Sequence, residues 1–419
     1  MSEPAAGDAS MRIGMVLRGF FPHDVRVEKE ARALSAAGHD VHLLCLGREE
    51  GREPTYDRVG PIAVRRIHRR ERYTTVQRTA KTVRYLLTLT DVIWRREMAR
   101  FVEEERLDAL HVHDLPLVRT GLAVAEAYDC PLVADLHENY PEAARQWRTG
   151  MALPRRTVQT LFTPVPRLKR LERDGVRRAD RVLAVTEEGK AHYVADCGVS
   201  PSSVAVVSNT VDLDTFDAET PPVDGYEEEF VLGYVGSFGP HRGLETAIEA
   251  MPAVVERVPN ARLLVVGSAG EAAYDRHLRE VAEETGVGER ITFTGWVDFE
   301  AVPAHIAAID LPFVLHRDNP HTATTVPHKL FQYMAMRKPV LVTDVGTLGR
   351  VVREADCGRV VADGDSAAVA DATVELAEDP ALREQLGEHA RGAVERTYNW
   401  ERETATLRGV YRDLATSAR

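Results

Sequence analysis

Short apolar runs alternate with longer stretches of helical periodicity along most of the chain. The first run, Met11–Leu17, precedes a helical stretch from Asp24 to Ala37, and the run Val41–Leu46 follows it. Asp24 is a favoured N-cap residue and Gly38 a favoured terminator, so both ends of this helix are marked. Buried strands that alternate with helices are typical of a parallel sheet with helices on both faces.

The alternation occurs in two blocks, separated by the acidic, proline-containing stretch Pro221–Glu229. In the first block the further predicted strands are Ala109–Val112, Leu132–Leu136, Val182–Val185 and Val204–Val207. In the second block they are Phe230–Val235, Arg262–Val266, Ile291–Thr294, Leu311–Leu315, Pro339–Thr343 and Arg359–Val361. Two such α/β halves of ordinary domain size predict two Rossmann-like, doubly wound domains facing a cleft.

The expected organisation has four parts. Residues 1–10 are small and polar, and we expect a disordered leader there. Residues 11–210 and 211–398 form the two domains. Residues 399–419 form a final helix, expected to pack back on the N-terminal domain.

Composition places the chain among soluble proteins. Its 419 residues are 44% hydrophobic and 28% charged, which are ordinary values for a globular protein. No apolar run approaches the ~18 residues that a spanning helix needs. The four cysteines are far apart in the sequence and fit no metal or disulfide spacing, which favours a reduced, cytoplasmic location.

Charge is unevenly distributed. The net charge is −12, yet residues 1–210 hold 33 basic and 29 acidic side chains. Two tracts, 60–100 and 143–181, each carry 11 basic and 3 acidic residues, interleaved with apolar ones. They fit either solvated helical faces or docking to an anionic membrane surface. The negative net charge and the absence of a recognised nucleic-acid-binding module argue against nucleic-acid binding.

The stretch from Thr324 to Ala335 predicts an anion site. It reads as a helix whose start carries Thr324 and Thr325 as hydroxyl caps and an early proline, Pro327. Free amides at a helix start attract anions. Lys329 lies in the first turn, where a cation is unfavourable unless an anion sits beside it.

Polar residues follow several predicted strands, where parallel sheets bind ligands. Gly19 follows the first strand and fits either close backbone approach to a ligand or a plain turn. Two further clusters are His111-Val112-His113-Asp114 and Asp135 to Asn139. These clusters fit a metal site, loop-satisfying polar residues, or a role in hydroxyl binding and proton handling.

A glycine-rich turn follows the strand Phe230–Val235. Gly236–Gly243 leads into a helical stretch, and a glycine-rich turn between a strand and a helix is a common phosphate-binding arrangement. The glycine spacing is not the dinucleotide-binding fingerprint. The Arg242 guanidinium could bind a phosphate through two hydrogen bonds, or its side chain could be solvated. Gly267 and Trp296 also follow strands, and Trp296 fits either core or rim packing or stacking on a base.

These segments, in this order, resemble the family-4 retaining glycosyltransferases, which have the GT-B fold. The most specific piece is Pro327–Ala335 leading into Lys338-Pro339-Val340. The supporting pieces are Asp24–Ala31, Gly236–Gly243, Val266-Gly267, Phe293–Val297 and Tyr398–Trp400. The resemblance covers the chain from about Arg12 to Leu414.

The resemblance implies a retaining transfer of a hexosyl or N-acetylhexosaminyl group from a UDP- or GDP-sugar, with no required metal or cofactor. It implies catalytic roles for His113, Arg242 and Lys329, with His113 preferred over His137 for contacting the donor sugar. His137 and Glu138 would lie on the acceptor side. The implied donor-binding residues are Gly19, Gly236, Ser237, Gly267, Trp296, Val297, Thr324, Thr325, Val326 and Gln332.

Four positions depart from the family pattern. Ser237 stands where the first of two phosphate-binding basic residues is expected, and Arg242 matches the second. Thr324 and Gln332 stand where the family has two glutamates. Arg337 stands at a family glycine, and an arginine in a left-handed turn there costs ~1–2 kcal/mol.

The expected function is therefore sugar transfer to an acceptor hydroxyl in glycolipid, polysaccharide or glycoprotein-glycan assembly. The acceptor would be lipid-linked or a saccharide, and the protein cytoplasmic, peripheral on the inner face of the membrane. Two alternatives remain. One is a nucleotide-sugar epimerase of the same fold, and the other is a catalytically impaired nucleotide-sugar-binding protein, suggested by Thr324 and Gln332.

Overall fold

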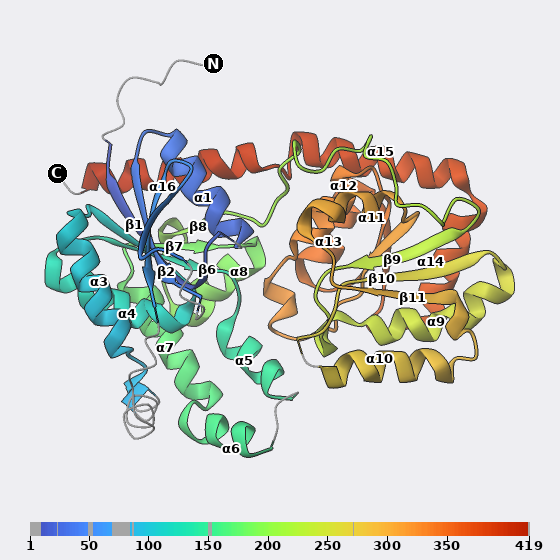
Figure 1. The fold of residues 1–419 in the computed structure, drawn as a ribbon, viewed down its shortest axis with the longest axis horizontal. Helices are drawn as coiled ribbons and strands as arrows, with labels where there is room; N and C mark the ends of the chain where they lie inside the picture. The colour runs from blue at the N-terminus through green and yellow to red at the C-terminus, as the bar shows by residue number, and fades with distance from the viewer. Residues whose placement is uncertain are drawn as a thin grey trace. The chain divides into compact units, whose positions relative to one another are not determined.

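The computed structural model describes residues 10–22, 24–48, 53–68, 84, 85, 88–149, 153–270 and 272–417. The chain divides into two compact units. Unit 1 comprises Met1–Ser208 and Glu403–Arg419, and unit 2 comprises Asn209–Arg402. Each unit has one sheet covered by helices (Figure 1). Residues 1–9 of the predicted leader lie outside the described residues.

Unit 1 has an eight-stranded sheet in the order β3-β4-β2-β1-β5-β6-β7-β8. All neighbouring strands are parallel except the hairpin β3–β4. The strands are β1 (Arg12–Phe20), β2 (Asp40–Leu46), β3 (Tyr56–Val59), β4 (Ile62–Ile67), β5 (Ala109–His113), β6 (Leu132–Leu136), β7 (Arg181–Ala184) and β8 (Val204–Val206). The hairpin was not predicted, because β4 carries Arg65 and Arg66 and lacks a continuous apolar run.

The helices of unit 1 lie between these strands in the sequence. They are α1 (Val25–Ala36), α3 (Val92–Glu105), α4 (Leu115–Tyr128), α5 (Tyr140–Thr149), α6 (Leu153–Phe162), α7 (Val165–Arg178) and α8 (Glu187–His192). The predicted cap of the first helix is confirmed, since Asp24 Oδ1 accepts from the amide of Val27 at 3.1 Å.

Unit 2 has a six-stranded parallel sheet in the order β11-β10-β9-β12-β13-β14. Its strands are β9 (Phe230–Val235), β10 (Ala261–Val266), β11 (Ile291–Gly295), β12 (Leu311–Val314), β13 (Val340–Thr343) and β14 (Gly358–Val361). Its helices are α9 (Leu244–Arg257), α10 (Ala272–Glu284), α11 (Val302–Ala307), α12 (His328–Ala335), α13 (Gly346–Ala355), α14 (Ser366–Glu378) and α15 (Pro380–Arg396).

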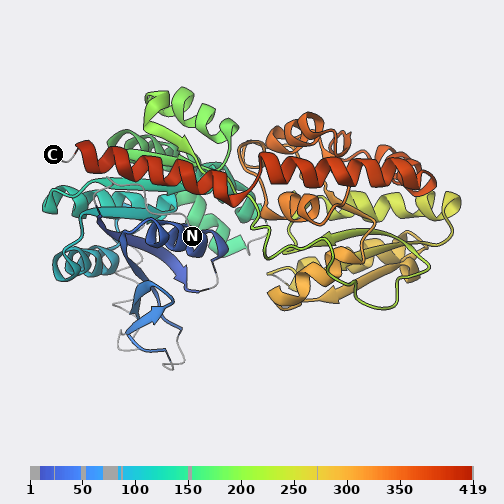
Figure 2. The ribbon, with the colours of Figure 1, turned by 90° about the horizontal axis from the view of Figure 1, so that it is seen from above.

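The last helix, α16 (Trp400–Ser417), belongs to unit 1 from Glu403 onward. The hydroxyl of Tyr411 lies 2.8 Å from His111 Nδ1 on β5. The amide of Ser208 donates to Glu403 Oε2 at 2.7 Å. Figure 2 shows the end of this red helix along the blue and teal elements of unit 1. No helix in the described part of the chain is long and apolar enough to cross a membrane.

The start of α12 differs from the prediction. The helix begins at His328 and has eight residues, and its N-cap, Pro327, provides no side-chain cap. The hydroxyls of Thr324 and Thr325 instead donate to the carbonyl of His321 at 3.2 Å, which closes a preceding 3-10 turn. At the other end, Arg337 has φ 53°, so the expected left-handed turn is present at this position.

Candidate functional site

The glycine turn after β9 brings a lysine against the backbone. Gly236 has φ 134°, and a Cβ built there would lie 2.7 Å from Lys329 Nζ. The positive φ favours glycine here, and a side chain at this position would displace the Lys329 amine from the turn. Gly243, at the other end of the turn, has φ 67°, and its Cβ would lie 1.8 Å from the carbonyl oxygen of Leu315. Conformation therefore favours glycine at both positions, and close approach to the backbone also requires it at Gly243.

Lys329 is buried, and no carboxylate among the described residues forms an ion pair with it. Its side chain reaches from α12, only 8% of the residue is exposed, and Nζ has no hydrogen-bond partner among the described residues. Nζ lies 3.4 Å from the ring centroid of Tyr234. Burial lowers the pKa of Lys329 well below its usual value, and the Arg242 guanidinium lowers it further. An unpaired buried amine is costly unless a ligand compensates it.

Arg242 is held in place by a histidine. Its Nη1 donates to Nε2 of His316 at 3.0 Å, so this imidazole accepts through Nε2 and is neutral. Burial, followed by the charges of Arg242 and Lys329, holds the pKa of His316 well below its usual range. The rings of His241 and His321 also lie in this group. We call His241, Arg242, His316, His321 and Lys329 the basic cluster.

Other predicted donor residues surround this turn. Ser237 is exposed, and its carbonyl accepts from the Tyr234 hydroxyl at 2.7 Å. The amide of Gly267 donates to the carbonyl of Gly295 at 2.9 Å, which joins two strand ends. Trp296 follows directly and is 73% exposed, so it does not pack in the core. Val297, Thr324, Thr325 and Gln332 are partly exposed, whereas Val326 is buried.

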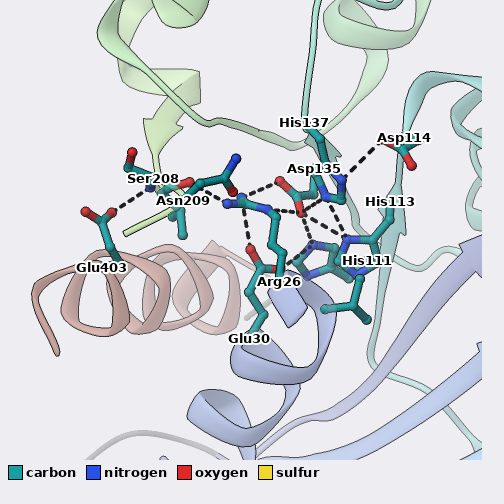
Figure 3. A network of polar contacts seen from close by, with 12 residues as sticks. Arg26, Glu30, His111, His113, Asp114, Asp135, His137, Ser208, Asn209 and Glu403 are labelled. Atoms are coloured by element: carbon teal, nitrogen blue, oxygen red, sulfur yellow. Dashed lines mark hydrogen bonds and ion pairs between the residues drawn. The ribbon is translucent and has the colours of Figure 1, made fainter. Parts of the chain in front are cut away.

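In unit 1, side chains from three elements converge on Asp135 at the end of β6 (Figure 3). Arg26 of α1 donates through Nη2 to Asp135 Oδ1 at 2.7 Å and through Nε to Oδ2 at 3.0 Å. Oδ2 also lies 3.0 Å from His113 Nδ1 and 2.7 Å from His137 Nε2. Glu30 completes the group, with Oε1 2.9 Å from Arg26 Nη2. The two polar strand ends therefore meet, as predicted.

Their surroundings give these groups different protonation states. Burial alone would raise the pKa of Asp135, but Arg26 and His137 hold it well below its usual range. Burial raises the pKa of Glu30 to about 7. Burial, aided by His111, lowers the pKa of His113 to about 3. For His137, Asp114 and Asp135 overcome burial and raise the pKa to about 10. At neutral pH, His137 is thus charged and His113 neutral.

Accessibility also separates the two histidines. The side chain of His113 is 0% exposed, whereas that of His137 is 18% exposed. Because Asp135 binds Nδ1 of His113, this geometry makes His113 a buried hydrogen-bonding group and leaves His137 nearer to solvent. Glu138 is partly exposed, and its carbonyl accepts from the Tyr193 hydroxyl at 3.2 Å. Gly19 lies in β1, between the exposed residues Arg18 and Phe20.

Glu30, His111, His113 and Asp135 have metal-ligating atoms within 4.8 Å of one another. Arg26 contacts both carboxylates of this set, so a protein cation already balances them. Its guanidinium would repel a divalent ion at the same oxygens.

The sequence did not predict a site role for Arg26 or Glu30, although both lie in the motif Asp24–Ala31. Their spacing of four residues on a helix was the available signal.

The basic tracts have different surroundings. In the tract 60–100, Arg65 and Arg66 are buried; Arg65 pairs with Glu104 at 2.6 Å and Arg66 with Asp57 at 3.0 Å. Part of this tract, residues 69–83, 86 and 87, lies outside the described residues. The tract 143–181 includes most of α5 and all of α6 and α7, with Trp147, Val158 and Leu161 exposed.

Comparison with known proteins agrees with these features. Residues 24–215 match the family described as Glycosyltransferase Family 4, and residues 229–379 match Glycosyl transferases group 1. A phosphatidyl-myo-inositol mannosyltransferase of Mycobacterium leprae is 30% identical over 326 residues, which are 76% of each chain.

Solved structures show the same fold. Sucrose-phosphate synthase from Thermosynechococcus elongatus has a TM-score of 0.78 at 20% identity, covering 97% of this chain and 100% of that one. Anabaena Alr3699/HepE in complex with UDP-glucose has a TM-score of 0.71 at 16% identity, covering 96% and 100%. The predicted fold is confirmed, and the chain belongs to the family-4, group 1 glycosyltransferases with the GT-B fold.

Proposed function

We propose that this protein is a retaining glycosyltransferase that uses a nucleotide-diphosphate-sugar, with the diphosphate held by the basic cluster of unit 2. The observation that carries this proposal is the buried Lys329 side chain, whose Nζ has no hydrogen-bond partner among the described residues and lies against Gly236. The UDP-glucose complex of the structurally similar HepE supports the class of donor. Exposed Trp296 would provide a stacking surface for the base.

The reaction breaks the bond between the anomeric carbon and a diphosphate oxygen. Negative charge grows on the leaving phosphate, and Arg242 and Lys329 are placed to stabilise it before the bond breaks. The acceptor hydroxyl attacks the anomeric carbon from the face that the diphosphate leaves, and its proton passes to the leaving phosphate oxygen. This route retains configuration without a protein nucleophile. Within unit 1, His137 is charged and partly exposed, so it is the histidine suited to binding hydroxyl groups there, and Asp135 orients it.

A thermal-shift screen of UDP- and GDP-sugars tests the donor. At 100 times its dissociation constant, a bound donor adds about 2.7 kcal/mol to the free energy of unfolding, which corresponds to a Tm increase of about 5–11 °C for a unit of this size. The same donor should produce a much smaller shift with Lys329→Met, which replaces a buried amine by an apolar side chain and should fold. A shift of equal size in the variant would remove Lys329 from the site.

Product analysis separates the enzyme classes. Transfer to an added acceptor with retained configuration supports the proposal. Isomerisation of UDP-N-acetylglucosamine without an acceptor would instead establish an epimerase. Donor binding with neither reaction would establish a binding protein.

We further propose a lipid-linked or saccharide acceptor and docking of α5–α7 on an anionic membrane. The M. leprae relative, named as acting on phosphatidyl-myo-inositol, supports a lipid acceptor. Leu161 on α6 is 72% exposed, and Arg156 on α6 and Arg170 on α7 are also exposed. Apolar side chains beside cationic ones suit a bilayer surface.

We expect the protein to float with vesicles containing anionic lipid at low salt, and Leu161→Glu to reduce the bound fraction several-fold. The variant adds a negative charge where an apolar side chain would enter the interface. Phe299→Ser, an exposed apolar residue of unit 2, is the control and should float like the wild type. Equal binding to neutral and anionic vesicles would contradict electrostatic docking.

A further inference from the structure

The diphosphate site of unit 2 has one arginine in the glycine turn, where the resembled family has two basic residues. Ser237 occupies the other position and carries no charge. Three histidines gather near Arg242 instead. The ring centroid of His241 lies 5.7 Å from that of His321 and 6.2 Å from that of His316.

We propose that His241 is the second phosphate-binding cation of the glycine turn and replaces the basic side chain that Ser237 lacks. The ligand is the diphosphate of a nucleotide-sugar, so this inference rests on the proposed function. His241 becomes a donor to phosphate oxygen when the ligand binds, beside Arg242 and Lys329.

Three geometric features support this assignment. His241 lies in the 3-10 turn Pro240–Arg242, directly before the arginine. Its backbone is fixed, because the amide of Arg317 donates to the His241 carbonyl at 3.0 Å. Its side chain is partly exposed, whereas His316 and His321 are buried. A ligand in the turn would therefore reach His241 before the other two rings.

The charges around His241 come from every neighbouring element. Arg242, His321 and Lys329 each lower the pKa of His241 when they are charged. Tyr234, next to Lys329, is neutral at pH 7. Three carboxylates lie on adjoining elements, and one of their oxygens, Glu245 Oε2, is buried without a hydrogen-bond partner among the described residues. Glu245 accepts from the Tyr274 hydroxyl at 2.6 Å, Asp363 lies 3.3 Å from Arg317, and Asp318 is exposed.

The consequence is proton uptake on binding. Burial and the Arg242 charge lower the pKa of His241 to about 3, so the free protein holds it neutral at pH 7. A diphosphate brings negative charge next to the ring and raises this pKa. The bound state then holds more protons than the free state, and affinity strengthens as pH falls, by at most about tenfold per pH unit for one proton.

Nucleotide-sugars are well suited to the test, because both phosphates are diesters and do not titrate between pH 6 and 8. We would measure binding of UDP-glucose and GDP-mannose by calorimetry at pH 7.0, in buffers with different ionisation enthalpies. We expect net proton uptake by the wild type. At maximal uptake, His241→Gln should take up about one proton fewer on binding than the wild type. It should also bind about 10-fold more weakly at pH 6.5.

Two further variants make the test specific. His241→Arg carries a permanent cation, so it should restore affinity and still lack the His241 proton uptake. Lys329→Met should keep the uptake that belongs to His241. Unchanged uptake and affinity in His241→Gln would overturn the role of His241. Wild-type binding without proton uptake would also overturn it, while the proposed function would stand. If no nucleotide-sugar binds, both are overturned.

Discussion

Replacing Arg242 with alanine is expected to lower kcat/KM for sugar transfer at least ~10-fold. The guanidinium is the fixed cation of the basic cluster, and charge-assisted contacts to phosphate are among the stronger hydrogen bonds in proteins. Its Nη1 is already oriented by His316 at 3.0 Å, so it requires no reorganisation when charge develops on the leaving group. Initial rates with the donor identified by thermal shift provide the measurement.

Arg317 is a matched control for this variant. It follows His316 in the sequence, and its Nη1 lies 3.3 Å from Asp363. Because its charge is already balanced, Arg317→Ala should change kcat/KM by much less than Arg242→Ala. Near-normal transfer by Arg242→Ala, with the fold intact, would exclude Arg242 from the diphosphate site.

Replacing Arg26 with methionine is expected to destabilise unit 1 by about 3–5 kcal/mol, the usual result of removing one partner from a buried ion pair. Methionine has a similar length, so little packing volume is lost. Asp135 would lose the guanidinium that contacts both its oxygens. Glu30, whose pKa is already raised to about 7, would become protonated and limit the loss. Denaturant unfolding, followed by a probe specific to unit 1, measures the change.

Arg32 provides the control on the same helix. Its Nη2 lies 2.7 Å from Glu28 Oε1, and its side chain is 50% exposed. Exposed pairs of this kind contribute about 0.3–0.5 kcal/mol. Arg32→Met should therefore have a small effect. Equal losses for Arg26→Met and Arg32→Met would show that the buried network around Asp135 does not stabilise unit 1.

The parts of the fold that the sequence predicted are those with strong local signals. Buried parallel strands are continuous apolar runs, and the glycine turn Gly236–Gly243 marks positions where no side chain fits. The strand-end residues His113, Asp135 and His137 were placed together because parallel strands end at one edge of a sheet. Each of these signals lies within one strand or one turn.

The parts that were missed depend on contacts between distant segments. Arg26 and Asp135 are separated by 109 residues, and Arg242 and His316 by 74. No local pattern indicates such a pair. The start of α12 was misjudged for a different reason. Thr324 and Thr325 are good caps, but their hydroxyls bind the carbonyl of His321 in a preceding turn.

The division of unit 1 between Met1–Ser208 and Glu403–Arg419 affects how the protein is made. A ribosome completes Asn209–Arg402 before it adds Leu407, Tyr411 and Leu414, which are buried in the finished protein. Until then, His111 Nδ1 lacks its Tyr411 partner. The nascent chain can thus finish its second unit before its first, the reverse of the usual vectorial order.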